Sequence, residues 1–143
     1  MDELTMLRKM VEEHDYVSAL AIIDELDEMA KDDKINKVES FVHILLLHLI
    51  KEQAEKHTTK SWTRSIEMAL RSIVKSNKRR SAGGYYLRPD ELKATIEESF
   101  SGAVQDAAYE AFGGAYTATR LGEMIDADQL KQEALDKILT YKQ

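Results

Sequence analysis

The sequence predicts an all-α protein, a compact bundle of about five to six helices with no sheet. Apolar residues recur every three to four positions along most of the 143 residues, which is the period of an amphipathic helix. Proline occurs once and glycine six times, so few positions interrupt a helix. The Tyr-Tyr-Leu run at 85–87 is expected to stay unpaired, because it is too short and isolated for a strand. This length suits one domain, so we expect a single domain over residues 1–143.

Two helices are expected at the N-terminus. An apolar stripe covers about residues 2–13, and Asp15 is a suitable N-cap for the helix that follows. That helix is expected to direct its apolar side chains inward: Val17, Leu20, Ile23, Leu26 and Ala30. Asp32 or Asp33 is a candidate cap for a helix that runs to about residue 56. The sequence leaves open whether residues 16–31 and 33–56 form separate helices or one kinked rod.

The remaining helices follow a central one. The segment 35–50 is apolar on most sides, which is typical of the innermost helix of a bundle. Thr59 or Ser61 is expected to cap a helix over about 61–77, and Pro89 to begin one that ends at Phe112. Small residues at 102–111 allow a neighbouring helix to approach closely. A last helix is expected from Asp126, after a short helix or irregular connector at 115–125.

Several of these segments resemble one bacterial family, which is abundant in cyanobacteria. Residues 45–51 read Leu-Leu-Leu-His-Leu-Ile-Lys, and Ser61-Trp62 follows with Ile66 four residues after Trp62. This order is similar to that of the family called domain of unknown function twenty-nine, although Ile50 replaces its usual leucine and the glycine loop looks longer. The resemblance covers about residues 4–112, with 115–143 as a C-terminal helical extension. It implies an all-helical fold and no established activity.

Composition limits the compartment and the chemistry. The chain has no cysteine, which excludes disulfides, thiol nucleophiles and cysteine zinc sites and suits a reducing compartment. The longest apolar run, residues 41–50, is too short to span a bilayer, which takes roughly 20 residues. The N-terminus is acidic and amphipathic, unlike a secretory signal. We therefore expect a soluble, cytoplasmic protein without a membrane partner.

Charge is strongly segregated along the chain. Residues 56–88 hold nine Lys or Arg and one acid, Glu67, a net charge of +8 in a chain whose total is −6. The candidate interaction patch consists of Lys60, Arg64, Arg71, Lys75, Lys78, Arg79 and Arg80. One interpretation is phosphate binding, with Gly83-Gly84 and Tyr85-Tyr86 as a stacking tip. We prefer a solvated face that neutralises acidic helices of the same fold or of a second subunit.

Two further residues have both a functional and a structural interpretation. His48 shares a helical stripe with Glu52 and Glu55, a spacing that offers one imidazole and two carboxylates to a metal. Trp62 is in phase with Ile66 and Ile73. The ligand set around His48 is incomplete, and a tryptophan in phase with apolar residues is usually part of the core. We therefore predict structural roles for His48 and Trp62, with no metal, no cofactor and no catalytic residue.

The leading hypothesis from the sequence is a non-enzymatic helical interaction module that self-associates or docks a protein partner. The alternative is a nucleic-acid-associated protein that uses the basic helix and loop at 60–88. A metal-dependent enzyme ranks third. The residues give neither the partner nor the oligomeric state, nor whether residues 76–88 are ordered.

Overall fold

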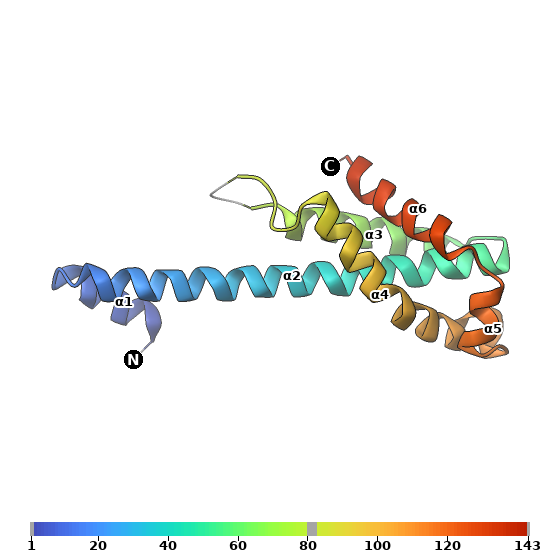
Figure 1. The fold of residues 1–143 in the computed structure, drawn as a ribbon, viewed down its shortest axis with the longest axis horizontal. Helices are drawn as coiled ribbons and strands as arrows, with labels where there is room; N and C mark the ends of the chain where they lie inside the picture. The colour runs from blue at the N-terminus through green and yellow to red at the C-terminus, as the bar shows by residue number, and fades with distance from the viewer. Residues whose placement is uncertain (1, 80–82, 143) are drawn as a thin grey trace. The chain divides into compact units, whose positions relative to one another are not determined.

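The fold is built from helices, as the sequence predicts. The computed structural model describes residues 2–79 and 83–142. Within these residues there are six α-helices, one 3₁₀ helix and no strand (Figure 1). Their bounds are α1 Glu3–Glu12, α2 Tyr16–Glu55, α3 Lys60–Asn77, α4 Pro89–Glu110, the 3₁₀ helix η1 Ala111–Gly114, α5 Ala118–Glu123 and α6 Ala127–Thr140.

The chain divides into two compact units. Unit 1 is Met1–Lys34 and unit 2 is Ile35–Gln143. Residues 16–31 and 33–56 are not separate helices, because α2 is one helix that continues past Asp32 and Asp33. Its residues 16–34 belong to unit 1 and its residues 35–55 to unit 2. The expectation of a single domain stays a prediction.

One hydrophobic core holds unit 2 together. Residues 38–54 of α2 are buried on several sides, as expected for an innermost helix. The same core contains apolar side chains of α3, α4, η1, α5 and α6, and α4 contacts α5, η1 and α6 directly. The small residues of α4 are part of it: Ala103, Ala107 and Ala108 are buried, and Gly102 lies against the His43 ring.

The helix ends follow local sequence signals. The backbone N–H of Ser18 donates to Asp15 at 3.3 Å, and that of Gln129 donates to Asp126 at 3.1 Å. Thr59, not Ser61, caps α3 by accepting from the Trp62 N–H at 3.0 Å. These side chains satisfy N–H groups that have no partner within the helix. Pro89 occupies the first turn of α4, as predicted.

We predict that the core residue Leu46 contributes far more to stability than the partly exposed Ile44 on the same helix. Leu46→Ala removes a fully buried side chain and should lower the free energy of unfolding by about 2–5 kcal/mol. Ile44→Ala should lower it by less than half as much, because Ile44 is 36% exposed. Urea denaturation followed by Trp62 fluorescence reports on unit 2. Equal losses would contradict the assigned core.

Candidate interaction surfaces

Five basic side chains form a stripe along α3. Lys60, Arg64, Arg71 and Lys75 are spaced four or seven positions apart, so they share one face of the helix, and Lys78 follows directly at its C-cap. All five are exposed. Within the described residues, none of them forms an ion pair with an acid. We call these five residues the basic stripe.

A shallow, open groove lies over the N-terminal half of the basic stripe. It has a volume of about 530 Å³ and is lined by Thr58, Thr59, Lys60, Thr63, Arg64, Glu67, Met68 and Arg71. Met68 is 48% exposed there, and the aliphatic stems of the basic residues add apolar surface. The only acid in the groove, Glu67, accepts a hydrogen bond from the Tyr141 hydroxyl at 2.8 Å. The groove therefore combines cationic side chains with an accessible apolar one.

A short ribbon follows the basic stripe, where the sequence predicted no pairing. Lys78 pairs with Tyr85 in an antiparallel bridge, the Arg79 N–H donates to Gly84 at 3.0 Å, and the Tyr86 N–H donates to Asn77 at 2.8 Å. The expectation that 85–87 stays unpaired was therefore wrong. The Arg79 guanidinium lies 5.6 Å from the centre of the Tyr86 ring.

The buried side chain of Asn77 fixes the base of this ribbon. Its amide nitrogen donates to the Leu87 carbonyl at 3.0 Å, and its amide oxygen accepts from the Leu87 N–H at 2.7 Å. Gly83 and Gly84 have φ of +74° and +73°, which glycine adopts without strain. Arg80, the remaining residue of the predicted patch, lies outside the described residues.

The residues assigned structural roles lie within unit 2. Trp62 is half-buried, and the Lys51 ammonium lies 4.6 Å from its ring centre. Lys51 is itself buried and pairs with Glu110 at 3.1 Å. His48 is half-buried, with its Nδ1 2.9 Å from the Ile44 carbonyl oxygen.

The two carboxylates that share a stripe with His48 have other partners. Glu52 accepts from the Thr58 hydroxyl, and Glu55 accepts from the Phe112 N–H at 3.2 Å. Among the described residues, no three His, Asp or Glu side chains are grouped as a metal would require. The structure thus does not bring His48, Glu52 and Glu55 together as a ligand set.

The apolar face of the N-terminal hairpin is exposed, which corrects a sequence-based expectation. We use "N-terminal hairpin" for α1, the turn at 13–15 and residues 16–34 of α2. Val17, Leu20 and Ile23 were expected to face inward, but they are 83%, 58% and 45% exposed. Ala30 is exposed as well, and only Leu26 of the predicted set is partly covered.

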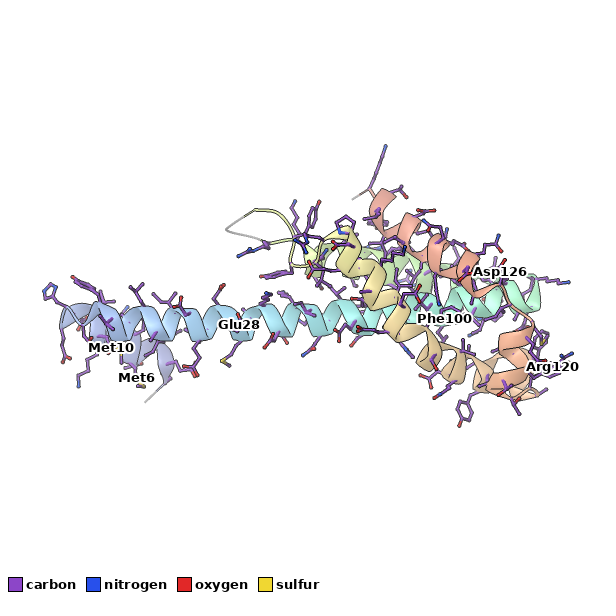
Figure 2. All side chains as sticks on the ribbon, viewed as in Figure 1. Met6, Met10, Glu28, Phe100, Arg120 and Asp126 are labelled. Carbon is purple, nitrogen blue, oxygen red and sulfur yellow. The ribbon has the colours of Figure 1, made fainter. Side chains whose placement is uncertain are left out.

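Almost nothing in the N-terminal hairpin is fully buried. Ala19 is its single buried apolar residue among those described, and α1 has none. The partly covered side chains of this unit include Leu7, Met10, Ile22 and Leu26. Figure 2 shows side chains standing out along both helices, with Met6 and Met10 labelled on α1 and Glu28 on α2. The hairpin thus has an inner seam and a second apolar face without cover.

Comparison with known proteins identifies a family but no characterised relative. The sequence model of the family described as domain of unknown function DUF29 matches residues 4–117, somewhat beyond the 4–112 expected. The comparisons with curated proteins and with solved structures give no match. None of the helices within residues 2–79 and 83–142 has the length and apolar character needed to cross a membrane.

We predict that Asn77→Ala destabilises the ribbon and the adjoining helices. It leaves the Leu87 N–H and C=O buried without partners, and each such group costs about 1–3 kcal/mol. The free energy of unfolding should fall by a comparable total, measured by urea denaturation. Lys78→Ala is the control, because this neighbouring side chain is exposed and should change stability by less than about 0.5 kcal/mol. Similar losses in the two variants would show that Asn77 does not anchor the ribbon.

Proposed function

The chain belongs to the family described as domain of unknown function DUF29, and we propose that it is a non-enzymatic interaction module that docks a protein partner through its N-terminal hairpin. The observation that carries this proposal is the exposed apolar face formed by Val17, Leu20 and Ile23. Three large apolar side chains on one short stretch of helix are more than the scattered single exposures normal on a protein surface.

The hairpin also gains structurally from a partner. Helix α1 has ten residues, and isolated helices shorter than about 12–15 residues are marginal in water. Packing within the hairpin fully buries only Ala19 among the described residues, so its own core contributes little. Fully covering a Val, Leu or Ile side chain stabilises by about 1.5–3 kcal/mol, of which association retains only a part. Covering three such side chains would therefore supply a substantial part of the free energy that docking requires.

The expected compartment follows from composition. The absence of cysteine suits a reducing environment, and we propose that the module works in the cytoplasm of a bacterial cell. Ala103, Ala107 and Ala108 of α4 do not contribute to docking, because they are buried inside the core of unit 2.

We predict that replacing the apolar face abolishes docking without unfolding the chain. Val17→Ser, Leu20→Ser and Ile23→Ser combined should remove self-association, measured by light scattering, or partner recovery in affinity capture from the native host. The matched control is Tyr109→Ser with Leu139→Ser, two exposed positions in unit 2. Circular dichroism checks that both variants keep their helix content. A wild-type chain that is monomeric and recovers no partner, or whose partner binds the serine variant equally well, contradicts the proposal.

A second candidate function is nucleic-acid association through the basic stripe. The observation that favours it is the row of exposed cations without ion pairs within the described part of the chain. Such cations can displace condensed counterions from a phosphate backbone. The net charge of −6 opposes the approach of a polyanion at long range, which is why this function ranks second.

For this second function we predict salt-sensitive binding of labelled DNA or RNA in a gel-shift assay. Lys75→Ala with Lys78→Ala should weaken binding several-fold and reduce its salt dependence. Each lost phosphate contact lowers the slope of log binding constant against log salt concentration by about one. Lys93→Ala with Lys142→Ala removes two exposed cations outside the basic stripe and serves as the control. If both pairs of substitutions have the same effect, or no shift occurs at low salt, the basic stripe is not a nucleic-acid site.

A further inference from the structure

We propose that the partner of the N-terminal hairpin is a second copy of this chain, whose basic stripe and adjoining groove on α3 receive the hairpin's apolar and acidic face. This inference rests on the proposed function and specifies its partner. It follows from three observations: the charge of the hairpin, the placement of its acids among its apolar residues, and the composition of the groove.

The two surfaces carry opposite charge. Residues 1–34 contain eleven Asp or Glu and four Lys or Arg, a net charge of −7. Residues 56–88 have nine basic residues against one acidic residue, a net charge of +8. Surfaces of opposite charge favour encounter and fix the orientation of two partners. The hairpin and the α3 region are therefore electrostatically complementary.

The acids of the hairpin lie on the same side as its exposed apolar residues. Asp24 follows Leu20 by four positions and Val17 by seven, and Asp27 stands in the same relation to Ile23 and Leu20. Residues at these spacings share one face of a helix. Neither aspartate forms an ion pair with a described residue. This face of α2 therefore presents apolar and anionic groups together.

The groove on α3 offers the matching combination. Met68 and the aliphatic stems of Arg64 and Arg71 can cover apolar side chains, and the two arginines also bring their positive charges to the groove. Each guanidinium can donate two parallel hydrogen bonds to one carboxylate. A helix bearing Val17, Leu20, Asp24 and Asp27 on one face fits both features.

Other occupants match these observations less well. Two hairpins packed on each other would bring two net charges of −7 together. A nucleic acid on the basic stripe would leave the apolar face of the hairpin uncovered. In a dimer of this kind, the hairpin of each copy lies on the basic stripe and groove of the other, so both surfaces are covered in both copies. Such a dimer is closed by a two-fold axis, the commonest symmetry of homo-oligomers.

Charge reversal in the full-length chain tests this arrangement. The hairpin variant is Asp24→Lys with Asp27→Lys, and the stripe variant is Arg64→Glu with Arg71→Glu. Sedimentation velocity over a concentration series at low and high salt gives the dimer dissociation constant. Each variant alone should weaken the dimer at least about tenfold, because like charges then meet. An equimolar mixture of the two, and the chain carrying all four substitutions, should regain dimerisation.

The control is Lys93→Glu with Lys142→Glu, which changes net charge as much as the stripe variant at exposed positions elsewhere. It should dimerise like the wild type. Circular dichroism confirms that each variant remains helical. A stripe variant that dimerises normally by itself overturns the inference, because the hairpin is then covered by another surface. Failure of both the mixture and the fourfold variant to recover overturns it as well.

The test separates this inference from the proposed function. A monomeric wild-type chain rejects the second-copy assignment. If that chain still binds another protein and the combined serine variant of the hairpin does not, the proposed function stands with a different partner. If the serine variant loses nothing, both proposals fail.

Discussion

The burial of residues 38–54 of α2 is the constraint on which the structure of unit 2 depends. A helix that is apolar on most sides can leave water only if other helices surround it, and α3, α4, α5 and α6 all contribute side chains to that core. The same burial explains why the Lys51 ammonium has two close partners. Its ammonium lies inside the fold, where an unpaired charge would be costly, and it is held by Glu110 and the Trp62 ring.

Local signals in the sequence were sufficient for the helical class and for most helix ends. Asp15, Pro89 and Asp126 begin helices because each satisfies or avoids an N–H group within one turn, which is a short-range interaction. The ribbon after α3 was missed because its pairing depends on the Asn77 side chain and on Leu87 ten residues later. Hydrophobic periodicity carries no information about such a contact.

The exposed face of the hairpin shows that hydrophobic periodicity alone does not predict which apolar side of a helix is buried. The pattern correctly indicates that Val17, Leu20 and Ile23 share one side of a helix, but it does not indicate which side meets another helix. The inner seam is formed instead around Ala19, with Ile22 and Leu26 partly covered. Both sides of this segment are apolar, and the single short helix α1 can cover only one of them. The sequence does contain a signal for this exposed surface. The segment has two apolar sides, and only one short helix precedes it to cover them.

The sequence alone locates the basic segment at residues 56–88. Only the structure shows which of its charged side chains form ion pairs. The preferred interpretation offered two sources of neutralising acids, the same fold or a second subunit. Among the described residues of unit 2, no acid forms an ion pair with the basic stripe, which leaves the stripe's charges available to acids from outside this unit. Charge alone would direct an encounter without giving much affinity, because exposed ion pairs contribute little and are screened by salt. The N-terminal hairpin combines the acids with apolar side chains that need cover, and this combination is what makes it a better match for α3 than an acidic surface would be.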